Sequence, residues 1–304
     1  MGIFVGAFFA LVLGHLLKPT IFSEYSGLIA WIIAGAIGIL LLGVLDDLYS
    51  VRFRYKMLVQ VIVGSGLVAS GLNVNLISIP FVSTFSLGWL NIPVSLLWFL
   101  VILNSINLID GMDGLAAGVS VIAGLTLLVV GIHYNAATIS FLMIALVGAL
   151  LAFLRFNFSP ARIFMGDSGS LLLGYVFAVA SLLCPVKSYT AVTLFVPLVA
   201  LGLPLAEALV SFSRRTLRLR TFYSPDNRHF HNILLELGLK PRTAVLVLYA
   251  ISVIFSGVSL LLMCFGQELG IKQLASLVLI GMVISAVAVS LLYKSHSPKR
   301  KVAA

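Results

Sequence analysis

The chain has 304 residues, of which 61% are hydrophobic and 10% are charged, and its mean hydropathy is +1.16. Because soluble domains usually carry about 25% charged residues, this composition excludes a soluble globular protein and predicts an all-α polytopic membrane protein. The net charge of +9 would suit nucleic acid as a partner, but the basic residues lie in a few connections beside apolar runs, which argues against that class.

The apolar runs predict about ten transmembrane helices, because about 20 apolar residues cross a bilayer as a helix. In chain order they cover residues 2–17, 28–45, 55–72, 91–104, 115–132, 136–153, 168–183, 189–212, 244–265 and 273–293. Residues 74–85 contain alternating β-branched residues and a proline, so a short outer β-hairpin is expected within residues 73–88. The long polar loop at residues 213–242 is the only other sizeable element. We therefore expect a single integral membrane domain over residues 1–304.

Basic residues are divided very unequally between alternate connections of this arrangement. One set of connections holds only Lys18, Lys187 and Lys272, and the other holds the rest of the 19 lysines and arginines. Because cytoplasmic loops carry the excess of lysine and arginine, the basic set is predicted to face the cytoplasm. Both termini are then expected to be cytoplasmic as well.

The aspartates all lie on this basic side, and five of them sit at or beside the end of an apolar run. A carboxylate near a membrane is costly unless it is solvated, paired or bound to a metal. The five are Asp46, Asp47, Asp110, Asp113 and Asp167, and glycines and asparagines flank them. This pattern predicts an acidic pocket on the cytoplasmic face that binds a divalent cation and phosphate groups.

The first acidic motif is the pair Asp46–Asp47, which ends an apolar run and precedes a basic stretch at residues 52–56. Adjacent carboxylates repel each other, so both stay ionised only near cations or water. The pair is therefore either a solvated helix end or a site that binds Mg²⁺ or takes a proton from a phosphate.

The second motif is a polar stripe. Asn104, Asn107, Asp110 and Asp113 recur at every third residue, so a helical turn would align their side chains. Glycines at positions 111, 114 and 118 permit tight turns and close approach of the backbone to a ligand. Such a stripe inside a hydrophobic chain is hard to explain by packing.

The third motif, at residues 164–170, directly precedes an apolar run. Asp167 or Ser168 is suited to cap the helix that follows, and the N-terminus of that helix would also attract anions. Capping does not explain Phe164, an aromatic residue in a polar turn. The motif as a whole therefore favours a binding function.

The fourth motif places His229 and His231 close to Asp226 and Arg228 in the long basic loop. Two histidines at this spacing, with no cysteine nearby, are a weak zinc signal. The arginine-rich context makes contact with phosphate the better interpretation.

These four motifs, in this order, resemble the polyprenyl-phosphate N-acetylhexosamine-1-phosphate transferase family (glycosyltransferase family 4). That family includes enzymes that start enterobacterial common antigen, O-antigen and teichoic acid linkage units, and phospho-MurNAc-pentapeptide transferase is a relative. The resemblance covers nearly the whole chain and is most specific at residues 104–116 and 164–174. It implies that a lipid phosphate attacks the sugar-linked phosphate of a UDP-sugar at the bacterial inner membrane, giving lipid diphosphate-sugar and UMP.

The resemblance also implies roles for particular residues. Asp46, Asp47 and Asp110 are expected to be catalytic, with Asp46 as the group that takes the phosphate proton. Asp167 and Asp47 are expected to bind Mg²⁺, for which Mn²⁺ is an expected substitute. The expected substrate-binding residues are Asn104, Asn107, Asp113 (toward the nucleotide), Phe164 (stacked on uracil), Arg228, and His229 and His231 (over the sugar diphosphate).

The implied substrates are a UDP-N-acetylhexosamine and a polyprenyl phosphate such as undecaprenyl phosphate, and a homodimer is compatible with the resemblance. GlcNAc is the preferred sugar, because the paired-histidine loop resembles that of UDP-GlcNAc users, while GalNAc and other hexosamines stay open. Three departures from the family pattern stand out: the sequence is expected to lack the first family helix, Asn232 replaces a third histidine, and Glu207 stands where the family tends to carry aspartate.

Three other functions compete with this interpretation. An ion- or proton-coupled transporter or flippase would place its carboxylates near the middle of the spans, whereas here they lie at one face. A CDP-alcohol phosphatidyltransferase would need an Asp-Gly-x-x-Ala-Arg signature, which is absent from the sequence. An inactive family member is kept open by the departure at Asn232 and the missing helix.

Overall fold

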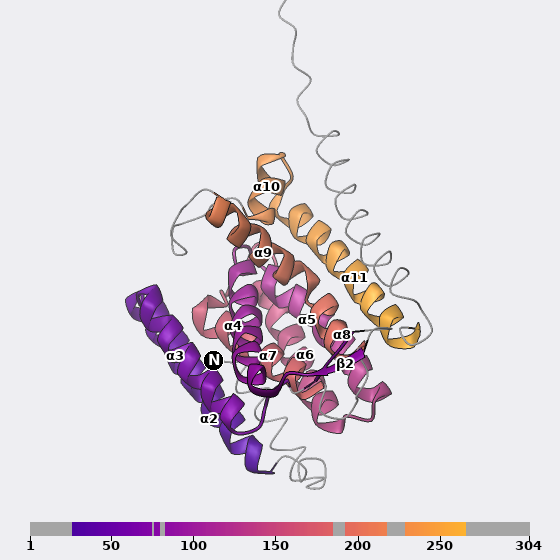
Figure 1. Cartoon of the computed structure of the whole chain (residues 1–304). Coiled ribbons are helices and arrows are strands. Elements are labelled where there is room, and N and C mark those ends of the chain that lie inside the picture. Colours follow the sequence, from indigo (N-terminus) through magenta and orange to yellow (C-terminus); the bar gives the residue numbers. More distant parts are fainter. Residues whose placement is uncertain (1–25, 75, 80–82, 185–191, 218–228, 266–304) are drawn as a thin grey trace, which may run out of the picture.

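The computed structural model describes residues 26–74, 76–79, 83–184, 192–217 and 229–265. The predicted spans at residues 2–17 and 273–293 lie outside the described residues, as do Asp226, Arg228 and both termini. In chain order the elements are α2 Ser26–Tyr49, α3 Phe53–Ala69, β1 Leu76–Ile79, β2 Ser83–Ser86, η3 Gly88–Leu90, α4 Asn91–Ile109, α5 Leu115–His133, α6 Ala137–Asn157, α7 Gly166–Leu183, α8 Val192–Ala200, α9 Gly202–Leu217, α10 Phe230–Glu236 and α11 Pro241–Phe265 (Figure 1).

Within the described residues, six helices are long and apolar enough to cross a membrane. They are Gly27–Tyr49, Gly88–Ile109, Leu115–His133, Ala137–Asn157, Gly166–Leu183 and Pro241–Phe265. Each overlaps a predicted span. The prediction of about ten spans is therefore supported at six positions, and the span predicted at residues 55–72 corresponds to the shorter helix α3, which has 17 residues.

The span predicted at residues 189–212 is wrong as a single helix. The chain forms two helices there, because α8 ends at Ala200 and α9 begins at Gly202. Pro204 lies in the first turn of α9. A proline has no N–H to donate to the carbonyl four residues earlier, here that of Ala200, and its ring clashes with that carbonyl, so the helix breaks where it does.

Three helices continue beyond the apolar runs that predicted them. α2, α4 and α6 end at Tyr49, Ile109 and Asn157, several residues past the predicted ends of their spans. The added turns contain polar side chains, and several of these find partners on other helices or on the connections between them, as described below. Because polar groups inside a membrane protein are costly when unpaired, these contacts explain how the helices extend into polar sequence.

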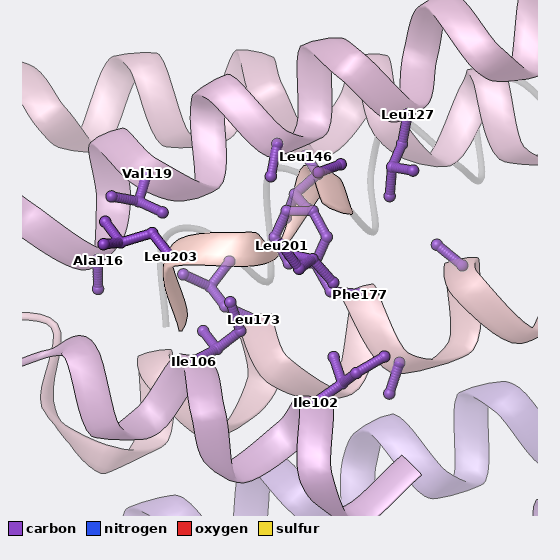
Figure 2. Packing of buried hydrophobic residues seen from close by; sticks show 14 of the residues in the cluster. Ile102, Ile106, Ala116, Val119, Leu127, Leu146, Leu173, Phe177, Leu201 and Leu203 are labelled. Atoms are coloured by element: carbon purple, nitrogen blue, oxygen red, sulfur yellow. The ribbon is translucent and has the colours of Figure 1, made fainter. Parts of the chain in front are cut away.

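The core lies where α4, α5, α6 and α7 meet the link between α8 and α9. Figure 2 shows Leu201, from that link, and Leu203, from the start of α9, among side chains of the four long helices. Small residues let the backbones come close. A Cβ atom added at Gly174 of α7 would lie 2.4 Å from the carbonyl oxygen of Leu103 in α4, so only glycine permits this helix contact.

The hairpin and the short helix α10 lie toward opposite ends of the bundle (Figure 1). β1 and β2 pair antiparallel, from Leu76 opposite Ser86 to Ile79 opposite Ser83, within the range in which the sequence predicted a hairpin. The backbone N–H of Val74 donates to Ser95 Oγ (2.8 Å), which ties the start of this segment to α4. α2 and α3 form an antiparallel pair along one side of the bundle, on the left of Figure 1.

Candidate functional site

The paired aspartates at the end of α2 contact two other helices. Asp46 is buried; its Oδ1 accepts the N–H of Val51 (2.7 Å) and its Oδ2 forms an ion pair with Lys56 of α3. Asp47 is exposed, and its two oxygens accept the N–H groups of Asp167 (2.7 Å) and Ser168 (3.1 Å). The pair is therefore more than a solvated helix end.

Asp47 caps α7, and this corrects the predicted cap. We expected Asp167 or Ser168 to cap their own helix, but Met165 occupies the N-cap position and forms no side-chain cap hydrogen bond. The donors at the start of α7 are instead satisfied by a carboxylate from α2. A carboxylate offers about four lone pairs, so Asp47 can accept these two hydrogen bonds and still coordinate a cation.

Lys56 in the first turns of α3 joins the two acidic motifs, and the sequence analysis did not identify it as a site residue. Its Nζ pairs with Asp46 and donates to Asp167 Oδ2 (2.8 Å). The only signal in the sequence was the basic stretch at residues 52–56, which did not distinguish Lys56 from the neighbouring arginines. We call Asp46, Asp47, Lys56, Asn107 and Asp167 the carboxylate side of the site.

The two asparagines of α4 have different surroundings. Asn107 Nδ2 donates to Ser170 Oγ (2.8 Å) and lies 3.4 Å from Asp167 Oδ1, so it belongs to the carboxylate side. Asn104 is paired with Gln60 of α3, with N···O distances of 2.8 and 3.3 Å, and Gln60 is only 1% exposed. Asn104 therefore links α3 to α4 one turn away from Asn107, and its contact with substrate stays a prediction.

Asp110 lies just after the end of α4, where its carboxyl group forms no hydrogen bond or ion pair within the described part of the chain. Its backbone (φ −77°, ψ 54°) leaves the helix. Burial, together with the negative charges of Asp167 and Asp47, raises the pKa of the Asp110 carboxyl to about 7. An acidic group with a pKa near neutrality that feels the charges of two other carboxylates is suited to proton transfer or to cation binding.

The predicted polar stripe is not one aligned face, because α4 ends at Ile109. Asp113 lies in the turn that follows, and its Oδ2 accepts the N–H of Ala161 (3.0 Å). Gly114 then takes a left-handed conformation (φ 79°) before α5 begins. Asp113 thus fixes the segment between α6 and α7, and a contact with the nucleotide stays a prediction.

A second side chain, Asn157, holds the same segment, and the sequence analysis missed it. Its Oδ1 accepts the N–H of Gly114 (3.1 Å), and its Nδ2 donates to the carbonyl of Ile163 (2.8 Å). The residue next to this anchor, Phe164, is 76% exposed. The turn after Asp110 and the segment carrying Phe164 are thereby held together, and Phe164 presents its ring to the outside of the protein.

The histidines are fixed by a buried glutamate on α9. Glu207 is 2% exposed; its Oε1 lies 2.9 Å from His229 Nδ1, and its Oε2 accepts the N–H of Phe230 (2.9 Å). The rings of His229 and His231 stack with centroids 5.5 Å apart and an interplanar angle of 11°. We call Glu207, His229 and His231 the histidine side of the site.

The histidine side contacts the turn after α4. A Cβ atom added at Gly111 would lie 2.4 Å from Cε1 of His231, so the absence of a side chain at position 111 lets the imidazole lie against this turn. Burial lowers the pKa of His231, as does its neighbour His229, while Glu207 acts in the opposite direction. His231 therefore favours its neutral form next to the residue that follows Asp110.

The oxygen donors of the site are of the kind that Mg²⁺ prefers. No group of three or more histidine, cysteine, aspartate or glutamate residues in the described segments is arranged to hold a metal ion. Mg²⁺, however, usually binds through one or two carboxylates, with waters and substrate phosphates completing its shell. The ammonium group of Lys56, shared between Asp46 and Asp167, also shows that this position attracts a cation. The residues therefore fit Mg²⁺.

These observations define a polytopic membrane protein with a polar, charged site at one end of its helical bundle. The family model of glycosyl transferase family 4 matches residues 29–184. The chain belongs to this family. The match includes Asp46, Asp47, Lys56, Asn107, Asp110 and Asp167, and it ends before the histidine side.

The chain is similar over most of its length to several transferases. It is 40% identical over 257 residues to the probable undecaprenyl-phosphate N-acetylglucosaminyl 1-phosphate transferase of Bacillus subtilis, covering 84% of this chain and 70% of that protein. It is 33% identical over 274 residues to the decaprenyl-phosphate N-acetylglucosaminephosphotransferase of Mycobacterium tuberculosis, covering 82% of this chain and 66% of that protein. A phospho-N-acetylmuramoyl-pentapeptide-transferase of Caldanaerobacter subterraneus is 34% identical over 235 residues, 72% of each chain.

Proposed function

We propose that this protein transfers N-acetylglucosamine 1-phosphate from UDP-GlcNAc to a polyprenyl phosphate and releases UMP. The observation that carries the proposal is the meeting of the family's acidic motifs at one end of the bundle, in a chain 40% identical to the Bacillus transferase. An oxygen of the lipid phosphate attacks the sugar-linked phosphorus of the UDP-sugar. The bond from that phosphorus to the bridging oxygen breaks, and this oxygen leaves with UMP.

The charge of the reactants explains why the site contains both acids and cations. A lipid phosphate and a nucleotide diphosphate repel each other, so positive charge must offset their approach. Asp47 and Asp167 would hold Mg²⁺, or Mn²⁺ in its place, and the ion would withdraw charge from the reacting phosphate. Lys56, whose ammonium group also pairs with Asp46, adds a further positive charge to the carboxylate side.

The remaining groups of the carboxylate side have proton-handling and orienting roles in this proposal. Asp46 takes the proton of the attacking lipid phosphate when that phosphate arrives protonated, and Asp110 orients the charged groups beside it. The Asn107 amide lies 3.4 Å from Asp167 Oδ1 and donates to Ser170 Oγ (2.8 Å) of the same helix, so it helps to hold Asp167 in place. The carboxylate of Asp167 is thereby held in position for the metal ion before any substrate binds.

The nucleotide is bound on the side of the exposed ring of Phe164. A uracil stacked on Phe164 gains about 1–3 kcal/mol, and Asp113 and Asn157 hold the segment that carries the ring. His229 and His231, with Arg228 beyond the described residues, contact the sugar diphosphate. His231, which stacks on His229, lies next to Gly111, so the diphosphate would pass between the two sides of the site.

The membrane arrangement completes the proposal. The site faces the cytoplasm of a bacterial cell, both termini are cytoplasmic, and the hairpin at residues 73–88 lies on the outer face. The basic loop predicted at residues 213–242 belongs to the cytoplasmic face in this proposal, and its residues 218–228 lie outside the described residues. The UDP-sugar arrives from the cytoplasm and the lipid phosphate from the membrane. The two substrates then meet at the helix ends, where the carboxylates lie.

The proposal is tested by a transfer assay on the full chain in detergent micelles. UDP-GlcNAc and undecaprenyl phosphate are supplied with Mg²⁺, with Mn²⁺, or with excess chelator, and UMP and lipid-linked GlcNAc are both measured. We expect the two products in equal amounts and only with the metal ions. UMP release without lipid product would indicate hydrolysis, and full activity in chelator would refute the metal role. UDP-GalNAc in a parallel reaction tests the choice of sugar.

A further inference from the structure

Lys56 occupies the position in which a metal ion would contact Asp167. Its Nζ contacts Oδ2 of both Asp46 and Asp167, which come from helices α2 and α7. The other oxygen of each carboxylate is also engaged: Asp46 Oδ1 accepts the N–H of Val51, and Asp167 Oδ1 lies near Asn107. The ammonium group is thus the cation that offsets both carboxylates in the described structure.

A lysine and a divalent cation cannot share this place. Nζ lies 2.8 Å from Asp167 Oδ2, and a metal ion on the same oxygen would stand within a few ångströms of a positive charge. Repulsion between such charges is strong in a partly buried site, where the effective dielectric constant is well below that of water. Binding of the metal at Asp167 and contact of Lys56 with Asp167 are therefore mutually exclusive.

The geometry also lets Lys56 leave. Its side chain is 24% exposed and that of Asp167 is 35% exposed, so the ammonium group has a direct route to solvent. Lysine carries its charge on a flexible four-carbon stem, unlike the planar fork of arginine, which grips two carboxylate oxygens at once. α3 need not move for the contact to open.

Resting on the proposed magnesium-dependent transfer, we propose that Lys56 is a tethered counter-cation that competes with the metal ion for Asp167. Without metal it neutralises Asp46 and Asp167, and metal binding displaces it from Asp167 while Asp46 remains within its reach. The consequence is that the protein alone binds the metal weakly. The ion binds tightly only together with the diphosphate of the sugar nucleotide, whose charge adds to that of the carboxylates.

The test measures Mn²⁺ binding to the full chain in detergent by electron paramagnetic resonance, without substrates. We expect Lys56→Met to bind Mn²⁺ about tenfold more tightly than wild type, which corresponds to about 1.4 kcal/mol. Lys56→Arg should bind Mn²⁺ no more tightly than wild type, since it keeps the charge. Lys240→Met is the matched control: it removes an exposed lysine without touching a carboxylate, and it should leave Mn²⁺ affinity unchanged.

A second measurement needs no variant and therefore does not depend on the folding of Lys56→Met. Wild-type protein is treated briefly with an amine-acetylating reagent, with and without Mn²⁺, and modification is read at each lysine by mass spectrometry. Mn²⁺ should increase modification of Lys56 several-fold and leave Lys240 unchanged.

The outcomes separate this inference from the proposed function. Equal Mn²⁺ affinity in wild type and Lys56→Met, or acetylation of Lys56 that is insensitive to Mn²⁺, would overturn the competition between lysine and metal while leaving the metal-dependent transfer intact. If wild type bound no Mn²⁺ and transferred sugar phosphate in chelator, the magnesium proposal itself would fail. Weaker Mn²⁺ binding in Lys56→Met would show that Lys56 supports the metal site and would also refute the inference.

Discussion

The carboxylate side and the histidine side of the site are held in different ways. On the carboxylate side, Asp167 is contacted by Lys56, Asn107 and Asp47, from three other helices. On the histidine side, Glu207 is the hydrogen-bond partner of both His229 and the first N–H of α10 within the described residues. A network with several partners can lose one and keep its shape, whereas an arrangement with a single buried anchor cannot.

This difference separates the kinds of damage that substitutions should cause. Changes on the carboxylate side should remove chemistry while the protein stays folded, since the remaining contacts still hold the helices together. Substitutions of Glu207, the anchor of the histidine side, should first displace the histidines. Activity should fall as a consequence of that displacement. The predictions below test this distinction, from the largest expected effect to the smallest.

Asp167→Asn should lower kcat at least about a hundredfold, because a neutral amide is a poor ligand for a hard cation. The amide can still receive the hydrogen bond from Lys56 and lie beside Asn107, so the melting temperature without metal should change little. Transfer rates with Mg²⁺ and thermal unfolding in detergent are measured on the same preparation. A large loss of stability would show that the carboxylate side is as dependent on one residue as the histidine side.

Glu207→Ala should lower kcat/KM by about tenfold to a hundredfold, since hydrogen bonds to a charged group contribute about 1.5–3 kcal/mol each. Both His229 and the N–H of Phe230 lose their partner, and the melting temperature should fall as well. Glu207→Gln, which keeps an oxygen for the N–H of Phe230, should recover stability more than activity. Equal rates in Glu207→Ala and wild type would show that the histidines do not take part in transfer.

Phe164→Ala should raise KM for the UDP-sugar about tenfold and leave kcat nearly unchanged. Stacking contributes about 1–3 kcal/mol and is present in both the ground state and the transition state. Because the ring is 76% exposed, its removal should not alter thermal stability. Phe164→Trp serves as the matched control and should retain binding. An unchanged KM in the alanine variant would remove the nucleotide from this part of the protein.

Much of the site could be predicted from the sequence because its charged residues lie at unusual positions in an apolar chain. Asp46, Asp47 and Asp167 lie at ends of apolar runs, where a carboxylate is costly unless it is paired, solvated or bound to a cation. The structure brings these three together. His229 and His231 stood out by their spacing in a basic loop, and they do stack. The position of a residue at the end of a span determines at which end of the bundle it lies. The sequence could therefore predict that these residues gather at one end, but not which of them contact each other.

The residues that the sequence analysis missed are single polar side chains whose partners lie far along the chain. Lys56 contacts a residue 111 positions away, and Gln60 one that is 44 positions away. Nothing in their local sequence distinguishes them from polar residues that face solvent. The expected alignment of Asp113 with the other polar residues of the stripe fails for a related reason: a regular spacing predicts one face only while the helix continues, and α4 ends before Asp113.

The smallest predicted effect is on the pH dependence of stability, and it concerns Asp110, where the two sides meet. Burial and the charges of Asp167 and Asp47 raise its pKa from 3.8 to about 7 in the folded protein. The folded state therefore favours the protonated carboxyl group. The stability that this proton contributes is complete below the unfolded pKa, near 3.8, and is lost as the pH rises through about 7.

We therefore expect the melting temperature of metal-free wild type to fall between pH 5 and pH 8.5 more steeply than that of Asp110→Asn. The asparagine variant, which carries no charge at either pH, should exceed wild type slightly at pH 5 and by a larger margin, a few degrees, at pH 8.5. Glu236→Gln, which removes an exposed carboxylate at the end of α10, is the control and should follow wild type throughout. Added Mg²⁺ should raise the melting temperature of wild type more at pH 8.5 than at pH 5, because the cation offsets the charge that burial penalises. If Asp110→Asn and wild type lost stability in parallel, the carboxyl group of Asp110 would already be ionised at pH 5, and the carboxylate side would have to stabilise one more negative charge than its described contacts provide for.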